Sequence, residues 1–370
     1  GTLIVGDSEA ALVVTTGGRI EAVGTEDAPI VFTSSAPEGS RSPGDWGGLV
    51  LLGKARINSS LGGEACDGEL GECTAGIEGL PVSEDRGQYG GNDDSHDCGT
   101  VKYVRIEFSG FTFGEDNELN TLTVGGCGDQ TEISYVQAHR GLDDGVEFFG
   151  GTANADHLII TGTGDDGLDW DQGYTGTVEN IIVHHFAPSS DDPRAFEGDN
   201  NGDNNDLLPR SAPTINYGTL IGSAQTDRGI VNRRGTFAIQ SGLIVTEFAK
   251  AGIDIRNGSW DLEDGWGENL LIEDSCFYNN SPNVPTDIDC GTDGEVDCND
   301  ESEGDFFAED VEIPVQTGMG MDVDPDLGDV SPALTGDGTP DYSAGNAACA
   351  GAFAPEGTDW TVGWTAFPAN

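Results

Sequence analysis

Oxygen-bearing side chains alternate in the stretch GDNNGDNND at residues 198–206, which makes it the clearest candidate for metal chemistry in this chain of 370 residues. Asp199, Asn201, Asp203 and Asn205 have the 1, 3, 5, 7 spacing of compact calcium loops. The bidentate Glu that closes an EF-hand is absent, so an EF-hand is excluded. The pattern predicts a structural Ca²⁺ site.

Two further acidic stretches have the same kind of ligands. The first, DIDCGTDGEVDCND, offers Asp287, Asp289, Asp293, Glu295 and Asp297. The second, DVDPDLGD, offers Asp322, Asp324 and Asp326. The alternative interpretation is that all three stretches are solvated loops of a surface adapted to saline water, where salt screens repulsion between carboxylates.

A different chemistry is suggested by acidic turns that recur before short apolar runs. Alignment of these turns places Asp144 over Asp166 and Glu147 over Asp169, with Phe148, Trp170 and Phe196 as an aromatic stack. It also places Asp171 and Glu197 in register with Arg233 and Arg256. Opposite charges one strand apart form a structural ladder. In the alternative interpretation, Asp143, Asp144, Asp165, Asp166, Asp169 and Asp171 form an acidic patch that binds Ca²⁺ or lies beside a sugar. A polysaccharide lyase or glycoside hydrolase would use the following residues of this face: Asp144, Asp166, Asp169, Asp171 and Arg233.

The elements that position these residues repeat at about 23 residues, in the segments 131–153, 154–177, 178–200, 211–236 and 237–259. Each repeat combines short Val, Ile and Phe runs with glycine-rich turns, and none has a helical apolar stripe. A fixed period of this length is typical of a solenoid. We therefore predict an all-β, single-domain, right-handed parallel β-helix over residues 1–370. A propeller blade would need 40 or more residues.

Three stretches interrupt the repeat, and a fourth follows it. Insertions are expected at 58–98, 198–212 and 279–310, where loops are long and polar. From 318 to 370 the repeat fades into a closing segment. Its Phe353, Trp360, Trp364 and Phe367 are expected to cap the open end of the solenoid, because an uncovered end exposes apolar core and strand edges.

Eight cysteines without zinc-type spacing predict disulfides and an oxidising compartment. We expect two local pairs, Cys66 with Cys73 and Cys290 with Cys298, which leaves Cys98 with Cys127 and Cys276 with Cys349. Sequence spacing alone does not fix this choice among 105 connectivities.

Charge limits the partners. The chain has 67 Asp and Glu against 15 Lys and Arg, a net charge of −52, so nucleic acid and anionic lipid are disfavoured. No apolar run is long enough to insert into a membrane. The chain starts with a strand-like run, TLIV, so we expect any signal peptide or anchor to precede Gly1.

Several stretches together resemble a group of secreted or outer-surface bacterial proteins that is common in Bacteroidota and also found in myxobacteria. The matching stretches include GDWGGLVLLGKARIN, GTVKYVRIEFSG, DDGVEFFGGTANADHLI, DDGLDWDQGYTG and the terminal DWTVGWT. The resemblance implies a right-handed β-helix with a lipoprotein or secretion-sorting signal. It implies no catalytic residues.

Together these patterns favour an extracellular or cell-surface β-helix with a structural or adhesive role, stabilised by calcium and disulfides and without catalysis. Its expected partners are polysaccharide or other surface and matrix proteins. Two alternatives remain: the polysaccharide-cleaving enzyme described above, and a subunit that self-assembles end to end into an extracellular filament.

Overall fold

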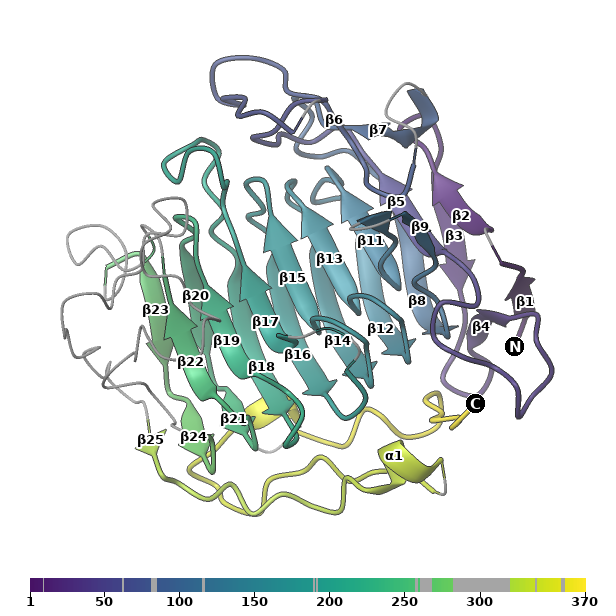
Figure 1. Cartoon of the computed structure of the whole chain (residues 1–370), viewed down its shortest axis with the longest axis vertical. Helices are drawn as coiled ribbons and strands as arrows, with labels where there is room; N and C mark the ends of the chain where they lie inside the picture. Colours follow the sequence, from purple (N-terminus) through teal and green to yellow (C-terminus); the bar gives the residue numbers. More distant parts are fainter. Residues whose placement is uncertain are drawn as a thin grey trace.

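The computed structural model describes residues 1–8, 10–61, 63–80, 85–114, 117–188, 190, 192–256, 259, 268–281, 320–336, 338–353 and 357–370. The chain winds into stacked coils whose strands pair in parallel with those of the neighbouring coils (Figure 1). The predicted all-β parallel β-helix is confirmed.

Two long parallel sheets run along the stack (Figure 1). Sheet one contains β1 (Leu3–Gly6), β3 (Ile20–Val23), β4 (Ile30–Ser34), β8 (Gly99–Glu107), β12 (Glu132–His139), β14 (Asn154–Thr161), β16 (Thr177–His184), β18 (Thr214–Ile221), β20 (Ala238–Ser241), β21 (Ile244–Thr246), β23 (Leu270–Glu273), β24 (Cys276–Tyr278) and β25 (Gly320–Met321). Sheet two contains β2 (Ala11–Val14), β5 (Gly48–Leu52), β11 (Leu122–Gly125), β13 (Val146–Phe149), β15 (Leu168–Asp171), β17 (Arg194–Gly198), β19 (Arg228–Asn232) and β22 (Ala251–Ile255).

Short elements lie outside these two sheets. Two antiparallel pairs are formed by β6 (Ala75–Gly76) with β7 (Gln88–Tyr89) and by β9 (Thr112–Gly114) with β10 (Asn117–Glu118). The helical turns are η1 (Asp85–Gly87), α1 (Pro332–Thr335) and η3 (Gly351–Phe353).

A corner inside the long strands of sheet one gives each coil three faces. Tyr135, His157 and Asn180 have left-handed backbone conformations, with φ of 55°, 55° and 58°. Each lies at the same point of β12, β14 or β16, where the strand turns from one face to the next. Left-handed residues bend the chain sharply, so one such residue per coil makes the corner without a loop.

The strand register confirms the period predicted from sequence. Val136 pairs with Leu158, 22 residues later, and Leu158 pairs with Ile181, 23 residues later. These side chains point inward and join one core that follows the axis of the solenoid, in which Phe148 and Trp170 are fully buried. Burial at about 25 cal/mol per Å² of apolar surface makes this core the main stabilising contribution.

The insertion at 58–98 packs on the outward side of sheet two. Tyr89 and Ile77 form a second apolar cluster with Val50, Leu52 and Phe149, which point away from the main core. The excursion at 198–212 joins this region, because Asn58 Nδ2 donates to Asn200 Oδ1 over 2.9 Å. Most of the insertion at 279–310 lies outside the described residues.

The sequence predicted that the C-terminal segment caps an open end of the solenoid, and this prediction was wrong. Trp364 and Phe367 instead pack on the outward side of sheet one, against Ile159, Ile182 and Ile221 of three successive coils. The segment runs back along the stack toward the N-terminal coils (Figure 1), and Gly39 N donates to the carbonyl of Asn370. We call residues 320–370 the strap. Outward isoleucines on three coils need an apolar cover along the flank, and the strap provides it.

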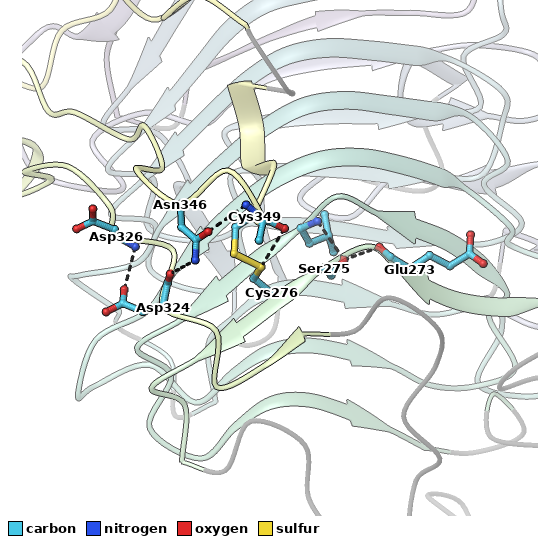
Figure 2. Close-up of a disulfide and its surroundings, with 9 residues drawn as sticks. Glu273, Ser275, Cys276, Asp324, Asp326, Asn346 and Cys349 are labelled. Atoms are coloured by element: carbon cyan, nitrogen blue, oxygen red, sulfur yellow. Dashed lines mark hydrogen bonds between the residues drawn. A yellow bond between two sulfur atoms is a disulfide. The ribbon is translucent and has the colours of Figure 1, made fainter.

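Three predicted disulfides are present: Cys66–Cys73, Cys98–Cys127 and Cys276–Cys349. The last joins β24 to the strap (Figure 2). Cys290 and Cys298 lie outside the described residues.

Candidate functional site

Acidic side chains form a column on the outward side of sheet two. Glu147 pairs in register with Asp169, and Asp169 with Glu197, on β13, β15 and β17. Their strand neighbours, such as Phe148 and Trp170, point into the core. Outward residues of a solenoid are usually solvated, yet Glu147 and Glu197 are only 7% and 6% exposed.

A second column lies at the turn that leads into these strands. Asp144 Oδ1 accepts a hydrogen bond from Asp166 N over 2.8 Å, and Asp166 Oδ1 accepts one from Arg194 N over 2.6 Å. Arg194 is in turn in register with Arg228. Each carboxylate therefore caps the turn of the next coil, and the column changes from acidic to basic along the axis.

The register predicted for β17 against β15 was wrong by two residues. Phe196 lies opposite Leu168 rather than Trp170, and Glu197 lies opposite Asp169 and Val231 rather than Asp171 and Arg233. The turn before β17 has two additional residues, so Arg194 takes the place opposite Asp166.

Arg256 was likewise misplaced in the predicted ladder. The residue opposite Val231 is Asp254, and Arg256 binds that carboxylate through Nη2 at 2.7 Å. Arg228 Nε binds it as well, at 2.8 Å. The two guanidinium groups outweigh the effect of burial and lower the pKa of Asp254.

Arginines also neutralise the acidic groups around Glu197. Arg194 Nη1 lies 2.5 Å from Glu197 Oε1 and 3.5 Å from Asp166 Oδ2. Arg233 contacts Glu197 Oε2 at 2.7 Å and Asp199 Oδ1 at 2.9 Å. These contacts form a buried ion-pair network at the C-terminal side of the acidic column.

This network engages the first residue of the predicted calcium loop. Both oxygens of Asp199 are taken, because Arg234 binds Oδ2 at 2.8 Å while Arg233 binds Oδ1. Asn201 Oδ1 accepts the backbone N–H groups of Asp203 and Asn204. Asn200 Nδ2 donates to the backbone carbonyl of Asn205. Binding of calcium at Asp199, Asn201, Asp203 and Asn205 stays a prediction, and it would compete with these contacts.

The other two predicted calcium stretches are placed differently. Asp287, Asp289, Asp293, Glu295 and Asp297 lie outside the described residues. In the strap, Asp324 Oδ1 accepts the backbone N–H of Asp326 over 2.8 Å, and Asn346 Nδ2 donates to the Asp324 carbonyl (Figure 2). This geometry describes a capped turn beside the Cys276–Cys349 disulfide. Calcium binding at Asp322, Asp324 and Asp326 stays a prediction.

Carboxylates gather most closely in the acidic columns themselves. Three groups have one oxygen from each member within 4.8 Å of the others: Asp143 with Asp144 and Asp165; Asp144 with Glu147 and Asp169; Asp166 with Asp169 and Glu197. Burial first, and neighbouring carboxylates second, raise the pKa of Asp144, Glu147 and Asp169 well above their ordinary values. Such groups could hold a metal ion.

The residues proposed for catalysis lie on this face, but they do not converge on an open cleft. Asp166 is 3% exposed and is bonded to Arg194. Burial, and then Asp199, raise the pKa of Asp171 to about 7. Arg233 binds Glu197 and Asp199 and is mostly buried. Asp144 and Asp169 are therefore brought together, whereas Asp171 lies at the other end of β15, opposite Phe149, and Arg233 is held by other carboxylates.

Comparison with known proteins agrees with this architecture. The pectate-lyase-like β-helix domain matches residues 1–365. The chain belongs to this family. No curated protein and no solved structure matches it. As a member of the pectate-lyase-like β-helix family, it has the expected fold over nearly its whole length. The match does not extend to the narrower group of bacterial surface proteins that the sequence resembles. Within the described residues, no helix is both long and apolar enough to cross a membrane.

Sequence reasoning missed the residues that border the carboxylate groups. Arg194 and Arg228 were not predicted, because the sequence alignment misplaced β17 relative to β15. Asn120 and Thr123 belong to the coil before the regular repeats, where no acidic turn marks the column. The register of β11 with β13, which places Thr123 beside Glu147, is visible only in the structure.

Proposed function

We propose that the protein is a non-catalytic β-helix of the extracellular space or outer cell surface, with a structural or adhesive role. The observation that carries the proposal is the burial of the carboxylates that catalysis would need. Of the candidate catalytic residues, Asp144 and Asp166 are only 7% and 3% exposed, and Asp166 is ion-paired to Arg194. A polymer that cannot reach these oxygens cannot be cleaved by them.

The compartment follows from the cross-links. Three disulfides join coils, loops and the strap, and such bonds persist in oxidising surroundings. The net charge of −52 supports an extracellular or surface location, because it keeps the protein soluble and disfavours nucleic acid.

One flat face offers a surface for adhesion. Alternate residues of β12, β14 and β16 point outward before the corner and line a shallow hollow of about 550 Å³ with Glu132, Asn154, Asp156, Thr177 and Glu179. Hydroxyl, amide and carboxylate groups repeat from coil to coil at the spacing between strands, roughly 4.8 Å. Such a strip is suited to hydrogen bonds with the hydroxyl groups of a neutral polysaccharide.

The alternative of a polysaccharide lyase or hydrolase has one specific observation in its favour. Asp169 and Asp171 keep partial exposure on the same face, and Asp171, with a pKa of about 7, could exchange a proton near neutrality. Both interpretations are therefore tested in one experiment.

The experiment measures binding and cleavage of neutral and acidic glycans by the purified protein. We expect binding without new reducing ends or unsaturated products. The paired variant Glu132→Ala, Glu179→Ala is expected to weaken binding, while Glu38→Ala, in the exposed loop between β4 and β5, leaves it unchanged. Products that are formed by the wild type and lost in Asp166→Asn would overturn the non-catalytic proposal.

A further inference from the structure

The group formed by Asp144, Glu147 and Asp169 differs from the other acidic residues of the column. One oxygen of each lies within 4.8 Å of the other two. Asp166, Glu197, Asp199 and Asp254 all have arginine partners. Among the described residues, no ion pair links Asp144, Glu147 or Asp169 to a lysine or arginine. Arg233 attracts Asp169 without forming an ion pair with it, so the three charges are compensated less directly than those of the other acidic residues.

Two further oxygen atoms beside this group have no hydrogen-bond partner. Thr123 is fully buried, its Oγ1 is unpaired, and its strand register places it on the same outward side as Glu147. Asn120 is also fully buried. Its Nδ2 donates to Glu147 Oε2, so the amide lies against the carboxylates, and its Oδ1 is unpaired.

One oxygen of the acidic group itself is in the same state, since Asp169 Oδ1 is buried without a partner. A buried polar atom left unpaired loses its hydrogen bonds to water without replacement, so native proteins rarely keep several such atoms at one place. Three unpaired oxygens beside three clustered carboxylates are most simply satisfied by a positive ion.

The ligand atoms define which ion fits. All are oxygens, from three carboxylates, one amide and one hydroxyl, and neither histidine nor cysteine takes part. Calcium accepts six to eight oxygen ligands in flexible geometry, whereas zinc prefers nitrogen and sulfur. Five residues can meet that number, because carboxylates can bind through both oxygens and water can supply the remainder.

We propose that Asp144, Glu147 and Asp169, together with Asn120 and Thr123, bind one calcium ion that links the coils of β11, β13 and β15. The ion replaces repulsion between three stacked carboxylates by attraction to a shared centre. This site adds Glu147, Asn120 and Thr123 to part of the acidic patch recognised from sequence, and it is separate from the three acidic loops. It does not depend on whether the protein binds or cleaves glycans.

The test uses the full chain after removal of metal with a chelator, and Ca²⁺ alone as the probe. For the wild type we expect heat on titration and a higher melting temperature with Ca²⁺. Asp169→Asn keeps the shape of the side chain but removes a ligand charge. Its affinity at this site is expected to fall on the order of tenfold or more, and elemental analysis after gel filtration should find one fewer ion per chain.

The order of melting temperatures of the wild type and Asp169→Asn is expected to reverse when the metal is removed, and this reversal identifies the site. In chelator, Asp169→Asn is expected to melt at the same or a higher temperature than the wild type, because it removes one of three repelling charges. In Ca²⁺, the wild type is expected to melt at the higher temperature. Asp27→Asn, in the exposed turn between β3 and β4, should behave as the wild type in both conditions.

Thr123→Val provides a second test that leaves the carboxylates intact, and it applies should Asp169→Asn not fold. It removes only the unpaired hydroxyl and is expected to weaken Ca²⁺ binding. Wild-type protein that shows neither heat nor a melting shift with Ca²⁺ would overturn the proposal. So would full retention of the ion by Asp169→Asn or, in its place, by Thr123→Val.

Discussion

The ring of Trp364 meets the ring of Tyr135 edge-on, with 6.0 Å between the two ring centroids. Tyr135 forms a corner of sheet one and stacks on Tyr103 of the preceding coil and on His157 of the next. Trp364 belongs to the strap and is fully buried. One side chain near the C-terminus thus covers the corners of successive coils.

The first prediction follows from this contact. Trp364→Ala should destabilise the protein by about 3–5 kcal/mol, the usual loss for a buried aromatic side chain. Denaturant unfolding followed by circular dichroism measures the change. Val362→Ala, at a strap position that is 52% exposed, is the matched control and should have little effect. Equal stability of the two variants would show that the strap does not stabilise the solenoid.

The second prediction concerns the bond that attaches the strap. Cys276–Cys349 closes a separation of 73 residues, whereas Cys66–Cys73 closes one of 7. If the cross-links act by limiting the unfolded chain, replacing both cysteines by alanine should cost about 4 kcal/mol for the first and about 2.5 kcal/mol for the second. Paired unfolding measurements compare them. A larger loss at Cys66–Cys73 would contradict the entropic explanation.

The fold was predictable because its signals are local and repeated. Apolar runs with a period near 23 residues fix the stacking of Val136, Leu158 and Ile181, and they also identify the acidic turns. The close spacing of Cys66 and Cys73 likewise led to a correct pair. These features depend on neighbours in the sequence or one coil away.

Features that depend on long-range contacts were not predictable. The strap lies where outward isoleucines such as Ile182 need an apolar cover. The sequence of one coil does not show which distant segment covers them. The corners at Tyr135 and His157 use bulky residues in a left-handed conformation that sequence preference assigns to glycine or asparagine. The column at Glu197 was missed because two additional turn residues shift the register, and a period of 23 cannot reveal that shift.

The third prediction contrasts two aspartates of the same column. Asp254 has two arginine partners, so Asp254→Asn leaves Arg228 and Arg256 without their shared counter-charge. Loss of one member of a buried ion pair typically costs about 3–5 kcal/mol, and we expect the lower end because asparagine retains the shape. Urea unfolding in chelator should show this loss for Asp254→Asn and none for Asp169→Asn. Similar losses in both would mean that the arginines do not distinguish the two sites.

The fourth prediction is a pH dependence that originates under the strap. His139 is fully buried, its Nδ1 lies 2.7 Å from Thr161 Oγ1, and its Nε2 lies 2.9 Å from the carbonyl of Pro368. Burial lowers its pKa to about 3 in the folded protein, from about 6.5 in an unfolded chain. Between these values the unfolded state binds more protons, so the stability that neutral His139 confers is complete above pH 6.5 and declines as the pH falls toward 3.

The His139→Gln variant isolates this contribution, because glutamine does not titrate while the carboxylates and other histidines are unchanged. Between pH 6.5 and pH 4, the free energy of unfolding of the wild type should fall by about 1.4 kcal/mol per pH unit more than that of the variant. Urea unfolding at half-unit steps of pH gives both slopes. Parallel curves would mean that His139 becomes protonated without loss of the fold, and that the strap opens readily enough to admit water.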